Sequence, residues 1–94
     1  MPQKSLLLVD DEPLIRESLA RELAGATLAV TVAASGEEAV ARLGREWFDV
    51  VVSDLVMPGL DGFQVLKAAK RKDRAIAVIL VAGFGDMDSA IEAL

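Results

Sequence analysis

The feature that most constrains this chain is the stretch at residues 48–62, FDVVVSDLVMPGLDG. Its apolar residues 50–52 lead directly to Asp54, and the helix-breaking residues 57–59, Met-Pro-Gly, follow. A short strand that is apolar on both faces is typical of the centre of a parallel sheet, because helices cover both of its sides. Ligands of open α/β sheets bind outside the carboxyl ends of the strands. We therefore expect Asp54 to point toward a site and away from the core.

A second apolar run, at residues 6–9, ends in the same way, in Asp10, Asp11 and Glu12. If the two strands are neighbours in a doubly wound sheet, Asp10, Asp11 and Asp54 converge on one crevice. Three ionised carboxylates repel one another unless a cation lies between them. Mg²⁺ fits best, because it accepts one or two carboxylates together with water and phosphate oxygens. Such a site is suited to phosphoryl transfer, with Asp54 as the nucleophile.

The rest of the chain alternates between the hydrophobic periodicity of helices and that of strands. Helical patterns are expected at residues 13–24, 35–44, 62–72 and 86–94, and strands at residues 6–9, 28–34, 48–53 and 76–81. This alternation implies an α/β fold with a parallel sheet and helices on both faces. In the third helix we expect Phe63, Leu66 and Ala69 to face inward. Its basic last turn, at residues 70–74, is interpreted as a favourable interaction with the helix dipole.

Composition narrows the classes of function. The chain has 94 residues, enough for one domain, and its net charge of -5 argues against direct binding of nucleic acid. Cysteine is absent, which excludes disulfides and thiolate metal sites. No apolar run has the length of a membrane span or the pattern of a signal peptide, so we expect no membrane association and a cytoplasmic location.

The chain resembles the receiver domains of two-component response regulators. The resemblance covers all 94 residues and rests on the motifs LLLVDDEP, VVVSDLVMPGLDGFQVL and VILVAGFGD. It implies a flavodoxin-like fold and a phosphoacceptor at Asp54. It also implies a Mg²⁺ site in which Asp11 binds directly, Asp10 largely through water, and the backbone carbonyl of Val56 supplies a further ligand beside Asp54.

The same resemblance implies the partners and the class of activity. The phosphoryl donor would be a sensor histidine kinase or a small acyl phosphate. The chain would then be a phosphoprotein of phosphorelay signal transduction. It would not be an enzyme in the usual sense, although self-phosphorylation and self-dephosphorylation use the same site.

Two departures from the family pattern affect these expectations. Receivers usually carry Thr or Ser where this chain has Ala82, so the switch and output region at Ala82, Gly83 and Phe84 lacks a hydroxyl that would favour the active state. The fifth strand and helix of the family, with their Lys, also have no counterpart. Residues 1–94 are therefore predicted to form an incomplete receiver domain, truncated after the fourth strand and the start of the fourth helix.

Without a fifth strand, residues 76–81 are predicted to form an apolar, unpaired edge of the sheet. We therefore expect either a longer parent chain, with a C-terminal output domain, or a partner chain that covers this edge. A dimer through the fourth strand and helix is one such arrangement.

Three other functions are alternatives to the receiver interpretation. A Mg²⁺-dependent phosphohydrolase would need a second acid two residues after its nucleophile, where Val56 stands. A flavin-binding relative of flavodoxin would need a hydroxyl- and Gly-rich loop after the first strand, whereas residues 10–12 would repel a phosphate. A receiver-like interaction module that is not switched by phosphorylation stays open because of Ala82, and metal binding without phosphorylation would favour it.

Overall fold

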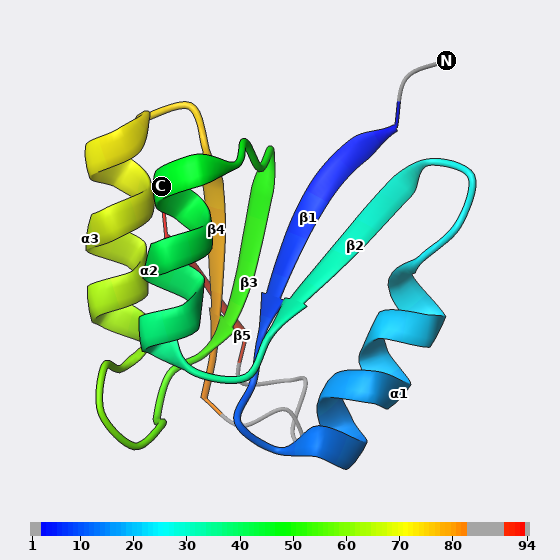
Figure 1. Ribbon diagram of the computed structural model, residues 1–94, viewed down its shortest axis with the longest axis horizontal. Helices are drawn as coiled ribbons and strands as arrows, with labels where there is room; N and C mark the ends of the chain where they lie inside the picture. Colours follow the sequence, from blue (N-terminus) through cyan, green and yellow to red (C-terminus); the bar gives the residue numbers. More distant parts are fainter. Residues whose placement is uncertain (1–2, 83–89, 94) are drawn as a thin grey trace.

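The sheet and its helices follow the predicted α/β order. A computed structural model describes residues 3–82 and 90–93. Along the chain the elements are β1 (Lys4–Val9), α1 (Pro13–Leu23), β2 (Leu28–Ala33), α2 (Gly36–Arg45), β3 (Val50–Asp54), α3 (Gly62–Lys72), β4 (Ala77–Val81) and β5 (Ala90–Ala93). The strand order is β2-β1-β3-β4-β5, in which the first four are parallel and β5 is antiparallel. Figure 1 shows α2 and α3 on one face of the sheet and α1 on the other. This is the flavodoxin-like fold expected from the sequence.

Two apolar layers hold the sheet between its helices. Successive side chains of a strand point to opposite faces, so Leu7 of β1 packs toward α2 and α3 while Leu6 and Leu8 pack toward α1. All three leucines are at most 5% exposed. The layer under α1 contains Ile15, Leu19 and Leu23, the residues that the periodicity of that helix predicts. In the part of the chain that the structure describes, no helix combines the length and the apolar character that a membrane span requires.

The starts of α2 and α3 are held by side-chain caps. Ser35 accepts a hydrogen bond from the backbone N–H of Glu38, as predicted, but the Glu38 carboxylate accepts from Ala34 instead of closing a box with Ser35. Asp61 and Gln64 form a complete capping box at α3, with hydrogen bonds of 3.0 and 2.9 Å. The second cap fixes the point at which the loop after β3 becomes a helix.

The third helix differs from the prediction in its rotation. Phe63, predicted to face inward, is 52% exposed, and Val65 is buried instead. The cause is Gly62, because a Cβ at this position would lie 2.6 Å from the carbonyl oxygen of Asp54. This close approach turns Gly62, Val65 and Ala69 toward the sheet at helical spacing.

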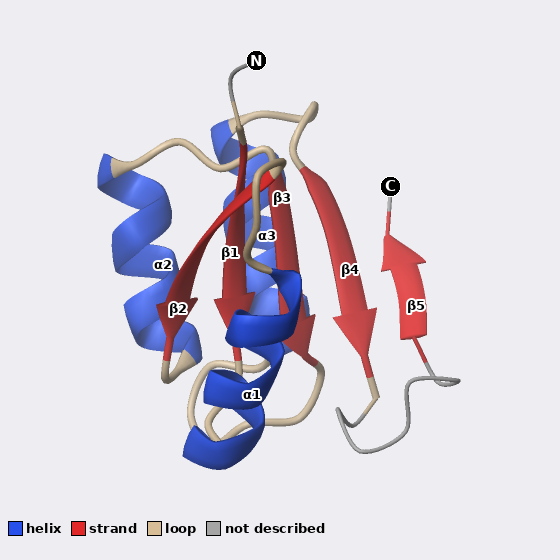
Figure 2. Ribbon diagram, turned by 90° about the vertical axis from the view of Figure 1, so that its right-hand side faces the viewer, coloured by secondary structure: helices blue, strands red, loops and turns tan. Residues whose placement is uncertain are grey.

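The last described residues also differ from the prediction. Residues 90–93 form β5 and not the helix predicted at residues 86–94, whose remaining positions lie outside the described residues. β5 pairs antiparallel with β4, from Val81 opposite Ala90 to Val78 opposite Ala93 (Figure 2). The prediction of an unpaired edge at residues 76–81 is therefore wrong for this structure. Physically, the ladder satisfies the backbone groups along β4, whereas a helix of so few residues would be marginal on its own.

Candidate functional site

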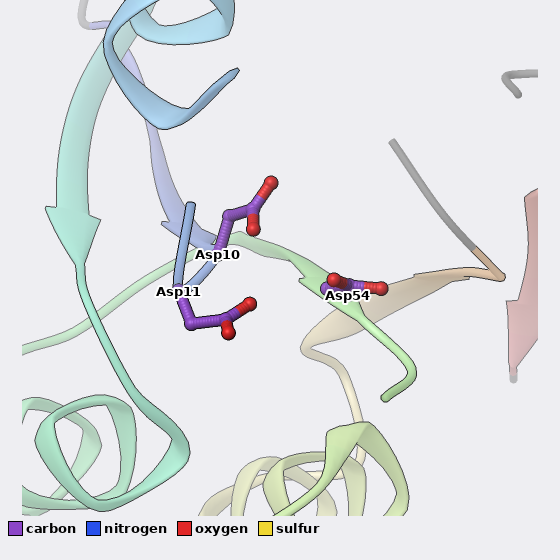
Figure 3. Close-up of side chains that lie close together, drawn as sticks. All are labelled: Asp10, Asp11 and Asp54. Carbon is purple, nitrogen blue, oxygen red and sulfur yellow. The ribbon is translucent and has the colours of Figure 1, made fainter. Parts of the chain in front are cut away.

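The sheet brings the three predicted carboxylates together. β1 and β3 are hydrogen-bonded neighbours, with Val9 opposite Ser53, so both strands end at the same edge of the sheet. Asp10 and Asp11 follow β1, and Asp54 is the last residue of β3 (Figure 3). One carboxylate oxygen from each of the three lies within 4.8 Å of the others. This arrangement could hold a metal ion.

Asp10 is the buried member of the cluster, with 1% of its surface exposed. Its Oδ1 accepts a hydrogen bond of 3.0 Å from the backbone N–H of Glu12. Among the described residues, its Oδ2 is buried without a hydrogen-bond partner. A buried oxygen of this kind is costly to desolvate unless a cation or a donor compensates it. The donor set therefore fits a hard divalent cation, which prefers oxygen ligands.

The electrostatics of the cluster point the same way. Burial raises the pKa of Asp10, the hydrogen bond from Glu12 opposes that effect, and the charges of Asp54 and Asp11 raise the pKa further. Burial likewise raises the pKa of Asp54, which hydrogen bonds from the backbone of Val56 and Leu55 counteract and the charge of Asp11 reinforces. Each ionised carboxylate of the cluster therefore disfavours ionisation of the others, and a bound cation would offset this repulsion.

The loop after β3 is built to pass close to Asp54. Leu55 donates its backbone N–H to Val81 on β4 and accepts from the N–H of Gly62, at 2.8 and 2.9 Å. Met57 anchors the loop in the core, whereas Val56 is 75% exposed. Gly59 turns the loop with a φ of 76°, a conformation that disfavours other residues. The loop therefore holds Val56 beside the carboxylate cluster.

Two residues that the sequence did not single out support the cluster. Arg16, one turn into α1, donates from Nη1 to the backbone carbonyl of Asp10 at 2.9 Å and so fixes the loop after β1. Ser53 is fully buried and donates its hydroxyl to the carbonyl of Asp54 at 3.0 Å. The only available signal for Arg16 was a basic residue one turn after an acidic loop, and Ser53 resembled any small residue in a strand.

The switch position lies at the same edge of the sheet. Ala82 is exposed and directly follows Val81, which is opposite Asp54 in the sheet register. Gly83 and Phe84, the other predicted switch residues, lie outside the described residues.

A doubly wound sheet with an acidic cluster at the ends of two neighbouring strands defines a class of regulatory α/β domain, and the comparisons identify it. Residues 6–94 match the family described as the response regulator receiver domain. The chain belongs to this family and is a receiver domain of the two-component response regulators.

Named regulators share much of this sequence. The chain is 41% identical to the DNA-binding transcriptional regulator NtrC of Salmonella typhimurium over 86 residues, which is 92% of this chain and 18% of the relative. It is 36% identical to the C4-dicarboxylate transport transcriptional regulatory protein DctD of Pseudomonas aeruginosa over 92 residues, 98% of this chain and 20% of that protein. The chain thus spans about a fifth of the length of these curated relatives.

Solved structures agree with this assignment. The chemotaxis response regulator CheY4 of Vibrio cholerae has a TM-score of 0.77 at 32% identity, covering 85% of this chain and 68% of that one. The response regulator TrrA of Thermotoga maritima, in complex with Mg²⁺ and BeF, has a TM-score of 0.73 at 34% identity, covering 84% and 67%.

Proposed function

We propose that this domain accepts a phosphoryl group on Asp54, from the phosphohistidine of a sensor histidine kinase or from a small acyl phosphate. The observation that carries the proposal is the packing of three carboxylates, with one oxygen from each within 4.8 Å of the others, one of them with a buried oxygen that has no partner among the described residues. Asp54 is the natural acceptor because it ends β3 and is partly exposed, whereas Asp10 is buried.

The metal of the proposed site is Mg²⁺. Asp11 and the backbone carbonyl of Val56 would bind it directly with Asp54, and Asp10 would act largely through water. When bound, Mg²⁺ would neutralise the oxygens of the phosphoryl group during transfer. The oxygen-only donor set of the described cluster supports this choice, as does the Mg²⁺ in the complex of TrrA.

The chain's own residues carry the transfer. An ionised oxygen of Asp54 attacks the phosphorus in line and forms an O–P bond, while the bond to the donor's imidazole nitrogen or acyl oxygen breaks. The departing atom keeps the electron pair. Burial and the charge of Asp11 raise the pKa of Asp54, and a bound cation would act in the opposite direction by favouring the ionised form. Arg16 and Gly62 keep the two loops of the site in place.

The partners follow from the length and the names of the relatives. NtrC and DctD are transcriptional regulators about five times as long as the matched segment. We place residues 1–94 as a single receiver domain, without the family's fifth strand and helix, in a longer parent with a C-terminal output domain. With a net charge of -5, this domain would control an output domain and would not itself bind DNA. The cytoplasmic location stays a prediction. The dimer through the fourth strand and helix was predicted to cover an unpaired edge, and because β5 pairs with β4 this reason for a dimer no longer applies.

Intact-mass spectrometry after incubation with acetyl phosphate and Mg²⁺ tests the proposal. The wild-type chain should gain the mass of one phosphoryl group, and Asp54→Ala should gain none. Asp49→Asn, at the opposite end of the sheet, is the matched control and should be modified like the wild type. Phosphorylation of Asp54→Ala to the wild-type extent would contradict the assignment.

A receiver-like interaction module is the second candidate, because Ala82 offers a methyl group where the family has a hydroxyl. A folded chain that binds Mg²⁺ but gains no phosphoryl mass would favour this module. If a version extended to the end of the parent chain were modified instead, the missing fifth strand would be the cause.

A further inference from the structure

A groove runs between α2 and α3 on the face of the sheet opposite α1. The two helices lie side by side (Figure 1), and their C-terminal halves line an open groove of about 320 Å³. Its apolar lining comes from Val40, Leu43 and Ala68, and its basic rim from Arg71 and Lys72. We call this the α2–α3 groove.

Gly44 leaves the groove open without being needed for the fold. It lies inside α2, where glycine is a poorer helix former than alanine. A Cβ at this position would meet nothing within 4 Å, in contrast to Gly62, which the sheet crowds. Its φ is not positive, so the backbone does not demand glycine either. What glycine provides here is space in the groove.

The groove lies in the most basic part of an acidic chain. Residues 42–46 and 67–74 contain seven of the ten basic residues and only two of the fifteen acidic residues. This part therefore carries a charge of +5 in a chain of net charge -5, so the remaining residues carry -10. Charge separation of this size attracts an acidic partner to one side of the molecule.

Favourable interactions within the domain account for only part of this charge. Lys70 and Lys72 donate to backbone carbonyls, and Arg42 pairs with Glu38 and Glu46.

Arg45 also pairs with Glu46, which leaves three basic residues of this part that are not paired in this way. Among the side chains of residues 3–82, Lys67, Arg71 and Arg74 take part in no ion pair. Lys67 and Arg71 are four residues apart on α3, a spacing at which like charges destabilise a helix. The helix dipole favours cations at this end, but it does not require them to surround an apolar groove.

We propose that the α2–α3 groove docks an amphipathic helix of another protein, one with an apolar stripe flanked by acidic residues. The apolar stripe would fill the space beside Gly44, and the acidic flanks would face Arg71. Nucleic acid or an anionic membrane fits less well, because contacts to phosphates need neither an apolar groove nor the open space beside Gly44. The docking surface is separate from the proposed phosphoacceptor site, since α3 starts beside Asp54 and ends about 15 Å farther along its axis.

The test measures the fluorescence anisotropy of a labelled peptide in which leucines at helical i, i+3, i+4 and i+7 positions are separated by glutamates. Wild type should bind it saturably at low salt and more weakly at high salt. Arg71→Glu and Gly44→Gln should each weaken binding by about tenfold or more, the scale of a central contact. Gly44→Ala, which leaves most of the space, should bind within about threefold of wild type.

Arg21→Glu is the matched charge control, because Arg21 lies on α1 across the sheet, and it should bind like wild type. Circular dichroism and urea unfolding establish that every variant is folded, and Gly44→Ala should unfold at a higher midpoint than wild type. Equal binding of a scrambled peptide of the same composition would overturn the proposal. So would the absence of saturable binding, or tighter binding of a DNA duplex or of phosphatidylglycerol vesicles.

Discussion

Carboxylates at the two ends of the sheet meet opposite surroundings. Asp49 precedes β3 at the amino end of the strands. Its Oδ2 accepts from the backbone N–H and the hydroxyl of Ser5, at 2.8 and 3.3 Å, and its Oδ1 accepts from the indole of Trp47 at 3.1 Å. The hydrogen bond from the Ser5 backbone is the main cause of a lowered pKa for Asp49, helped by the bond from Trp47. The protein itself therefore stabilises the charge of Asp49.

Asp10 and Asp54 lie at the carboxyl end of the same strands and have raised pKa values. Within the described part of the chain, the side chain of Asp10 accepts one hydrogen bond and has one buried oxygen without a partner. The contrast shows that residue type does not distinguish a structural carboxylate from one that needs a ligand. What distinguishes them is whether burial outweighs the protein donors, as at Asp10 and Asp54, or the donors outweigh burial, as at Asp49.

The largest difference between the two ends of the sheet should be in how much Mg²⁺ stabilises variants at each end. Binding to the folded state alone stabilises it by about 2.7 kcal/mol at a free ion concentration one hundred times the dissociation constant. We expect this gain for wild type and for Asp49→Asn, and its near-complete loss for Asp11→Asn, since Asp11 is the proposed direct ligand. Urea unfolding with and without Mg²⁺ measures it. An equal gain in Asp11→Asn would place the ion elsewhere.

Without metal, removing one charge from the carboxylate cluster should make the folded domain more stable. Asp10→Asn places an amide beside the ionised Asp54 and Asp11 and can donate where Oδ2 had no partner. We expect a gain in unfolding free energy of about 1–2 kcal/mol in EDTA, the scale of a buried unsatisfied group. Urea midpoints give the value, and a loss of stability would mean that the charge of Asp10 is already compensated. The variant should also bind Mg²⁺ more weakly.

The carboxylates at the two ends of the sheet also differ in whether the sequence could predict their surroundings. The carboxylate cluster was predictable because two apolar strands each end in Asp, and neighbouring parallel strands end at one edge. The inward residues of α1 followed from periodicity. Asp49 was not predictable, because its donor Ser5 is 44 positions away and nothing in the local pattern links them.

The two wrong predictions, for Phe63 and for residues 90–93, each have a physical explanation. Phe63 was predicted to be buried from its apolar character, but the close approach of Gly62 to Asp54 sets the rotation of α3. Residues 90–93 match a helical pattern, yet they pair with β4 because an open strand edge competes for them. In both cases a tertiary contact outweighs a weak local preference, which periodicity cannot register.

Asp49 should matter for folding and not for the metal. In Asp49→Asn the amide NH2 faces either the indole N–H of Trp47 or the backbone N–H of Ser5, so one of the hydrogen bonds that Asp49 accepts is lost. We expect the melting temperature to fall by about a few degrees. Thermal unfolding measures this change. The added stability from Mg²⁺ should match that of wild type, and a reduced gain would mean that the two ends are coupled.

The smallest effect, and the one that compares the two ends directly, is the dependence of stability on pH without metal. The pKa values of Asp10 and Asp54 are raised on folding, so the folded state holds their protons more tightly than the unfolded state does. Their contribution is complete below the ordinary Asp pKa of about 3.9 and is lost as the pH rises through their folded values. The lowered pKa of Asp49 acts in reverse: its contribution is present above that ordinary value and is lost as the pH falls through its folded value.

Urea midpoints measured in EDTA between about pH 3 and pH 7 give the stability as a function of pH. Each part of that curve can then be assigned to one end of the sheet. Asp10→Asn should flatten the loss of stability on the neutral side of pH 4. Asp49→Asn should flatten the loss on the acidic side and leave the neutral side unchanged. Because Mg²⁺ binds ionised carboxylates, adding it should reverse the neutral-side slope in wild type, so that stability rises with pH. Parallel curves for wild type and Asp10→Asn would show that Asp10 does not titrate differently in the folded and unfolded states, and would remove the electrostatic distinction between the two ends.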